Sequence, residues 1–282
     1  MPGMIEENPE LVQPESWARM KSWSGKTPVF LFHDGGGTTF AYHCLDPLQR
    51  FTYGVRNPHF FSGRRFEGGV PEMAAEYITR IRAAVAADSF TPKRRDNGGV
   101  GPVDILVGGW SLGGMTSLEV ARQLHGDPDL RVRGILMIDS AFPALLAERR
   151  QQVISLDNEE DPEAQAREEE GKTKNQVLSM RAMREARRMI ARWELPRWDW
   201  TAAIDADRGA GPRSALGWER YDERMFVDVL DVDGHHFNMF DHSRIPGITA
   251  AIAKALTRLD PRTAEEDGQS FGDSWDSAHA GF

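Results

Sequence analysis

Short apolar runs alternate with segments of helical period through most of the chain. The runs at residues 29–32, 104–107 and 134–138 are compact, and each adjoins a proline, glycine or aspartate. Such runs are typical of strands that are buried on both faces of a parallel sheet. They predict three strands of one sheet.

Apolar residues at helical spacing fill the intervals between these runs. Residues 72–86 and 112–124 each place their apolar side chains on one face, and residues 248–259 form a last amphipathic helix. Strand and helix in alternation predict the α/β class, with a mostly parallel, doubly wound sheet and right-handed crossovers. A further apolar strand is predicted at residues 225–230, directly before a pair of histidines.

Residues of about 145–192, called the lid segment below, interrupt this alternation. Residues 157–170 are rich in acidic side chains, whereas residues 172–192 are basic with apolar residues at helical intervals. One interpretation is a solvated helical surface over a modest apolar stripe, and the other is a mobile lid over a site. Three tryptophans follow, which would line a substrate chamber or pack the lid on the core: Trp193, Trp198 and Trp200.

The two ends of the chain differ from its middle. Residues 1–26 are an acidic lead-in with prolines, and residues 260–282 are polar and rich in small residues, which predicts a disordered tail. Residues 27–259 therefore form the expected single domain, which is long enough for a substantial buried core.

Composition excludes several classes of function. The net charge of -9 argues against general binding to nucleic acid, whose phosphates need a basic surface. No apolar run reaches the length of about 18 residues that a membrane span needs, and the N-terminus lacks a secretory pattern. The single cysteine, Cys44, allows neither an intrachain disulfide nor a cysteine metal cluster. A cytoplasmic protein is expected.

The candidate chemistry begins with a serine between a predicted strand and a predicted helix. Residues 109–113 read Gly-Trp-Ser-Leu-Gly, a G-x-S-x-G motif in a strand–turn–helix context. A nucleophilic serine at such a turn is strained, and small neighbours relieve the crowding. Ser111 is the predicted nucleophile, and the backbone N–H of Leu112 at the helix start is a predicted oxyanion donor. The alternative is a glycine-rich turn in which Ser111 caps the helix.

A second donor is expected from the loop after residues 29–32, which reads His-Asp-Gly-Gly-Gly at residues 33–37 and is called the glycine loop below. Consecutive glycines let backbone N–H groups approach a ligand closely. The N–H of Gly35 is the first choice and that of Gly36 the second. A flexible turn is the alternative, and the patterns of phosphate-binding loops are absent.

The predicted base is one of two adjacent histidines, His235 and His236. An imidazole titrates near neutral pH and can take the proton of a serine hydroxyl. The spacing does not choose between the two, and His242 lies further along. A metal site built from Asp233, His235, His236 and Asp241 is a weaker alternative, because no other ligand cluster supports it.

The predicted acid is Asp139, which ends the run at residues 134–138 and could orient an imidazole. A strand-end aspartate is often only a turn residue. In folds with a serine at this kind of turn, the acid commonly follows a later strand, where Asp205 and Asp207 lie.

Four segments in order resemble the thioesterase domains of fungal polyketide synthases, which have the α/β-hydrolase fold. The similarity covers about residues 27–258 and includes VFLFHDGGGT at 29–38, VGGWSLGGM at 107–115, IDSAFP at 138–143 and GHHFNM at 234–239. It implies Ser111 as nucleophile, Asp139 as acid and His236, the histidine before phenylalanine, as base. It also implies Gly35 and Leu112 as oxyanion donors. The lid segment and the apparently free-standing chain depart from this family.

The resemblance implies a serine thioesterase that releases an acyl chain through an acyl-serine intermediate. Its partner would be an acyl carrier protein or polyketide synthase, and the phosphopantetheine of the carrier would hold the substrate without a further cofactor. Release by hydrolysis and by cyclisation both stay open. Two alternatives are a carboxylesterase or lactonase for small molecules and a non-catalytic module that binds a synthase.

Overall fold

A five-stranded sheet forms the centre of the molecule in the computed structural model, which describes residues 7–13, 25–90, 101–144, 146, 162–195, 215–222 and 225–260. The strand order is β1-β3-β2-β4-β5, and all neighbours are parallel except the edge pair β1 and β3. The bounds are Glu10–Leu11 for β1, Val29–Phe32 for β2, Thr52–Val55 for β3, Val103–Trp110 for β4 and Leu130–Ile138 for β5.

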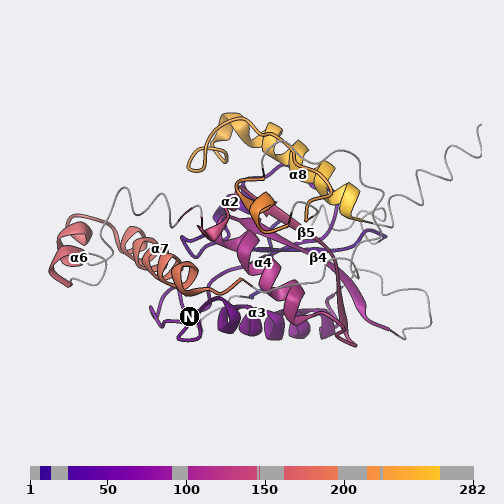
Figure 1. Ribbon diagram of the computed structural model, residues 1–282, viewed down its shortest axis with the longest axis horizontal. Helices are drawn as coiled ribbons and strands as arrows, with labels where there is room; N and C mark the ends of the chain where they lie inside the picture. The colour runs from indigo at the N-terminus through magenta and orange to yellow at the C-terminus, as the bar shows by residue number, and fades with distance from the viewer. Residues whose placement is uncertain are drawn as a thin grey trace, which may run out of the picture.

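Helices cover both faces of this sheet, as the alternation predicted. Helices α3 and α4 pack on one face with α7, while α8 and the short α2 lie over the other (Figure 1). Two hydrophobic clusters separated by the sheet form the core. The helices are α2 (Phe40–His43), α3 (Gly69–Ala86), α4 (Leu112–Gln123), α6 (Pro162–Glu169), α7 (Lys174–Arg192) and α8 (Ile245–Leu259), with the 3-10 turns η4 (Trp218–Arg220) and η5 (His242–Arg244).

The carboxyl ends of three adjacent parallel strands meet at one edge of the sheet. Phe32 at the end of β2 is in register with Gly109, and Trp110 at the end of β4 is in register with Ile138. The residues that directly follow these strands therefore emerge side by side. They are the glycine loop, Ser111 and Asp139, so the topology brings three predicted site segments together.

The strand predicted at residues 225–230 is wrong. These residues are described and form no strand, and no described strand pairs with the outer edge of β5. Asp228 instead binds Arg258 of α8, and the Val227 side chain is 66% exposed. The run packs through a few side chains, such as Val229, without the ladder of backbone hydrogen bonds that defines a strand.

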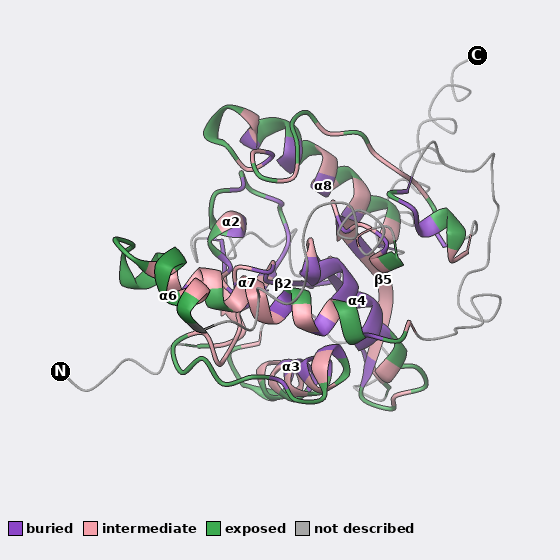
Figure 2. Cartoon of the chain, turned by 60° about the vertical axis from the view of Figure 1, so that its left-hand side comes forward, coloured by how far each residue is buried: buried purple, intermediate pink, exposed green. Residues whose placement is uncertain are grey.

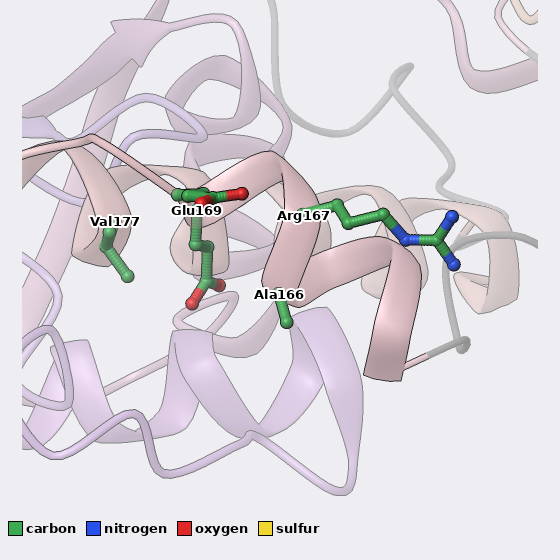
Figure 3. A pocket seen from close by; sticks show the side chains of 5 residues that line it. Ala166, Arg167, Glu169 and Val177 are labelled. Carbon is green, nitrogen blue, oxygen red and sulfur yellow. The ribbon is translucent and has the colours of Figure 1, made fainter.

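Helices α6 and α7 of the lid segment form a hairpin in which α6 projects from the body. Glu169 of α6 accepts hydrogen bonds from Arg181 and Arg184 of α7, which fixes the pair, and much of α6 is exposed (Figure 2). An open cavity of about 500 Å³ lies between the two helices, lined by Ala166, Arg167, Glu169, Glu170 and Val177 (Figure 3). None of the predicted site residues lines it.

Helix α7 is held against the body at its apolar side. Its carboxylate Glu185 accepts from the Phe66 N–H at 3.2 Å, and Arg188 donates to the Phe66 carbonyl at 2.8 Å. Leu178, Ala186 and Met189 are buried. The apolar stripe predicted for this segment is therefore a packing surface.

No described helix is both long and apolar enough to cross a membrane.

Candidate active site

Ser111 lies in a strained turn between β4 and α4. Its backbone has φ 56° and ψ -114°, in the left-handed half of the map that side chains other than glycine rarely adopt. Ser111 is the N-cap residue of α4, but its side chain makes no capping hydrogen bond. The hydroxyl is thus not used to hold the helix, which disfavours the reading of Ser111 as a plain cap.

The glycines on either side of this turn are required by the end of β2. A Cβ on Gly113 would lie 2.3 Å from the Phe32 carbonyl oxygen, and one on Gly109 would lie 2.6 Å from the same atom. Both distances are impossible for a real side chain. The G-x-S-x-G pattern therefore reflects the close approach of the turn to β2 and its glycine loop.

The end of β5 also fixes the turn. The Ser111 N–H donates to the Ile138 carbonyl at 2.9 Å, and the buried Ser140 hydroxyl donates to the Ser111 carbonyl at 2.7 Å. The carbonyl of Ser140 in turn accepts from the indole N–H of Trp218 at 2.6 Å. Both backbone polar groups of Ser111 are thereby satisfied, so the strained conformation is held from outside.

A histidine and an aspartate from distant parts of the chain meet beside this turn. Nδ1 of His236 and Oδ2 of Asp139 are 2.6 Å apart in a hydrogen bond, and both side chains are partly exposed. Because a carboxylate only accepts, Nδ1 carries the proton, and a neutral ring leaves Nε2 as the acceptor. Asp139 has φ 43°, a second strained residue at this edge.

The indole of Trp110 connects this pair to the serine. Its ring centroid lies 5.4 Å from that of His236 and 5.0 Å from that of Phe240. Within the described residues, no hydrogen bond joins the Ser111 hydroxyl to His236. Bonds between a nucleophile and its base are often long before substrate binds. The structure thus places the His236 imidazole next to the serine turn, but the hydrogen bond between the imidazole and the Ser111 hydroxyl is not formed.

The glycine loop lies between the serine turn and α7. A Cβ on Gly35 would meet Met183 Sδ at 2.6 Å, and one on Gly37 would meet the Ala182 side chain at 3.2 Å. Gly37 has φ 84°, which glycine adopts without cost. The lid segment therefore contacts the loop directly, and it does so where side chains are absent.

Asp34 places a further carboxyl group in this loop. Burial raises its pKa to about 6, against the opposing effects of the Gly36 backbone N–H and the charge of His236. A Cβ on Gly36 would lie 3.1 Å from Asp34 Oδ1. The N–H of Gly36 thus interacts with the Asp34 carboxylate, which leaves Gly35 as the less engaged of the two donors that the sequence offered.

We expect Asp34→Asn to change how the free energy of unfolding depends on pH. The carboxyl group titrates near pH 3.8 in an unfolded chain and near 6 in the folded one. Below pH 4 it is protonated in both states, and between pH 4 and 6 only the unfolded chain has ionised. The wild type therefore carries a cost of charge burial that grows over this window and is complete above pH 6. The variant lacks this cost.

Denaturant unfolding of both proteins from pH 4 to 8 measures the difference. Relative to the wild type, the variant should gain at most about 3 kcal/mol between pH 4 and pH 6 and little beyond. His33 lies next to Asp34 and also has a displaced pKa, but it is present in both proteins. A difference in the free energy of unfolding between the two proteins that does not change with pH would contradict the raised pKa of Asp34.

Several predicted candidates lie elsewhere. His235 is exposed and its Nδ1 accepts from the Phe237 N–H, while His242 is exposed in η5. Asp233 and Asp241 face Arg244, and no metal-binding group of three suitable side chains occurs within the described part of the chain. Trp193 is buried in the core, whereas Asp205, Asp207, Trp198 and Trp200 lie outside the described residues.

Sequence reasoning missed the residues that support the site. Besides Ser140 and Asp34, the buried Tyr42 hydroxyl donates to the Phe32 carbonyl at 2.5 Å and accepts from the Trp110 N–H at 2.8 Å. It thus ties the ends of β2 and β4 together. The serine of the IDSAFP segment was visible in the sequence, but nothing signalled the role of Tyr42.

Comparison with known proteins agrees with this architecture. A mostly parallel sheet with helices on both faces and a nucleophile turn after a central strand defines the α/β-hydrolase fold. The crystal structure of the NocB thioesterase domain from the nocardicin cluster has the same fold, with a TM-score of 0.54 and 24% identity over 82% of this chain and 93% of that one.

The curated relatives identify the family. The thioesterase frbD of Dothideomycetidae sp. (strain 11243) is 30% identical over 260 residues, which span 83% of this chain and 90% of that protein. The chain therefore belongs to the thioesterase family and is a hydrolase. The nonribosomal peptide synthetase imqB of Aspergillus flavus is 36% identical over 141 residues, which cover 50% of this chain and 4% of that synthetase. No family model matches the chain.

Proposed function

We propose that the chain is a serine thioesterase in which Ser111, His236 and Asp139 act as nucleophile, base and acid. The observation that carries this proposal is the hydrogen bond between His236 and Asp139, next to a strained serine whose hydroxyl does not cap its helix. Asp139 holds the imidazole in the tautomer that leaves Nε2 free to accept a proton.

In the first half of the reaction, Ser111 Oγ forms a bond to the acyl carbon and the carbon–sulfur bond breaks. The proton of the hydroxyl passes to His236 and then to the leaving thiolate. In the second half, water attacks the acyl-serine, its proton returns to Oγ through His236, and a carboxylic acid leaves. Alternatively, a hydroxyl of the acyl chain, or a carbon that becomes a carbanion by giving its proton to His236, attacks in place of water. The proton then returns from His236 to Oγ, and the product is cyclic.

The oxyanion is bound by the backbone N–H groups of Gly35 and Leu112. Leu112 is the first residue of α4, so its N–H lacks an acceptor in the helix. Neither N–H donates to a protein acceptor within the described residues. Each such donor contributes about 2.7–4 kcal/mol to lowering the barrier.

The substrate is an acyl chain on the phosphopantetheine arm of a carrier protein from a polyketide or peptide synthase, and no other cofactor takes part. The match to a segment of the synthetase imqB supports a synthase as the partner. The single domain spans residues 27–259, and the lid segment covers the acyl-binding side. The contact of α7 with Gly35 and Gly37 supports this placement.

Turnover of matched thioesters and oxygen esters with the same acyl group tests the proposal. The thioester should be cleaved with the higher kcat/KM, and attachment of the acyl chain to a carrier protein should increase that value further. Preference for the oxygen ester with no effect of the carrier would instead identify an esterase or lactonase.

A further inference from the structure

A buried histidine contacts the backbone of the glycine loop. Nδ1 of His33 is hydrogen-bonded to the carbonyl oxygen of Asp34, and Nε2 lies 2.5 Å from the Tyr77 hydroxyl. His33 is 3% exposed, and Tyr77 on α3 is fully buried and stacks on Phe32 at 5.5 Å. Neither side chain takes part in the reaction proposed above.

The hydrogen-bond partners determine where the protons of His33 and Tyr77 lie. A carbonyl oxygen only accepts hydrogen bonds, so Nδ1 of His33 must carry a proton. Burial lowers the pKa of His33 to about 4, so the ring is neutral at pH 7 and Nε2 is an acceptor. The Tyr77 hydroxyl therefore donates to Nε2. Tyr77 thereby selects the tautomer in which His33 can hold the Asp34 carbonyl.

This carbonyl belongs to the same peptide unit as the N–H of Gly35. The peptide bond is planar, and among the described residues only the bond between Asn8 and Pro9 is cis. The Gly35 N–H therefore points opposite to the Asp34 carbonyl. The carbonyl accepts from His33 and, at 3.1 Å, from the Gly37 N–H. These two hydrogen bonds fix the direction of the Asp34 carbonyl, and the planar peptide therefore fixes the direction of the Gly35 N–H as well.

The residues just before this peptide unit lie against the nucleophile turn. A Cβ on Gly113 would be 2.9 Å from the His33 carbonyl oxygen, which places the start of the glycine loop beside the first turn of α4. A rotation of the peptide between Asp34 and Gly35 would direct a carbonyl oxygen, instead of an N–H, to where the oxyanion develops. Repulsion would then replace stabilisation.

We infer that His33, oriented by Tyr77, is a positioning residue that holds the Gly35 N–H in the direction needed to bind the oxyanion. This inference rests on the proposed function, because it assumes that Gly35 is an oxyanion donor. It predicts that loss of the hydrogen bond at Nδ1 lowers the rate of acyl transfer without weakening the binding of substrate.

A pair of substitutions separates the hydrogen bond from the volume of the ring. His33→Leu removes the donor, whereas His33→Asn keeps an N–H near the position of Nδ1 and loses only the contact to Tyr77. We expect kcat to fall about 10- to 100-fold in His33→Leu with KM within about threefold of the wild type, because a displaced donor costs less than an absent one. His33→Asn should recover kcat to within about threefold.

Tyr77→Phe provides a second route that leaves His33 in place. It removes the hydroxyl but keeps the ring that stacks on Phe32, and kcat should fall several-fold with KM unchanged. This variant decides the question if the substitutions at His33 do not fold. Wild-type kcat in His33→Leu or in Tyr77→Phe, or equal losses in the leucine and asparagine variants, would overturn the inference.

Ser111→Ala, assayed in parallel, distinguishes this failure from a failure of the proposed function. Turnover that persists in Ser111→Ala would refute both the role of Ser111 as nucleophile and the role of Gly35 as oxyanion donor. An inactive Ser111→Ala beside a fully active His33→Leu would leave the triad in place and remove only the positioning role of His33.

Discussion

Ser111→Ala should lower kcat for thioester hydrolysis by about 10⁶-fold, because loss of the nucleophile also idles the base and the acid. The fold should survive. The hydroxyl makes no capping hydrogen bond to α4, and alanine keeps the same Cβ in the strained turn. The measurement is steady-state turnover, with the melting temperature recorded for each protein.

Ser62→Ala provides the matched control, since Ser62 is exposed on a loop and, within the described part of the chain, its hydroxyl bonds only to backbone groups of His59 and Arg64. It should retain the wild-type rate. If Ser111→Ala kept more than about one hundredth of the wild-type kcat with an unchanged melting temperature, another group would have to be the nucleophile.

His236→Ala should reduce kcat by a similar factor, about 10⁶-fold, because no other group in the proposed mechanism accepts the serine proton. The adjacent histidine makes this test specific. His235 is exposed, and among the described residues its side chain accepts only from the Phe237 N–H, so His235→Ala should stay within a few-fold of the wild type. Both variants are compared by kcat at saturating thioester.

The reverse result, with His235→Ala inactive and His236→Ala active, would show that the hydrogen bond between His236 and Asp139 has no catalytic role. Equal activity of both variants would point to a base outside this segment. Either outcome would remove the proposed triad while leaving the fold assignment untouched.

The centre of the sheet could be predicted because its strands are apolar on both faces. β2 was predicted at its observed bounds, and the predictions for β4 and β5 covered their most apolar parts. The N-terminal half of β5 was missed because Arg131 and Arg133 alternate with apolar residues there, a pattern typical of an edge strand. The helices at 72–86, 112–124 and 248–259 were confirmed with starts or ends shifted by a few residues.

Two short strands and one false strand show where local pattern fails. β1 has two residues, and β3 contains Gly54, whose missing side chain makes room for Val12 and Thr39. Such short segments become strands only through their partners. The run at 225–230 has the residues of a strand but pairs with no described strand, because tertiary pairing outweighs local propensity.

The chemical groups of the site were readable from sequence, whereas their supports were not. Ser111 stood in a motif with a mechanical reason, and the resemblance selected His236 and Asp139, which the structure brings into one hydrogen bond across 97 positions. His33 and Tyr77 are separated by 44 positions, and their contact depends on α3 packing against the end of β2. A tertiary contact of this kind cannot be predicted from the periodicity of the sequence.

Mass analysis of the protein after reaction with a fluorophosphonate probe tests the central claim most directly, because it needs no knowledge of the acyl substrate. We predict one adduct per chain, mapped by peptide sequencing to Ser111, formed far more slowly in His236→Ala and absent from Ser111→Ala. No adduct on the folded wild-type protein, or an adduct on any other residue, would contradict the account.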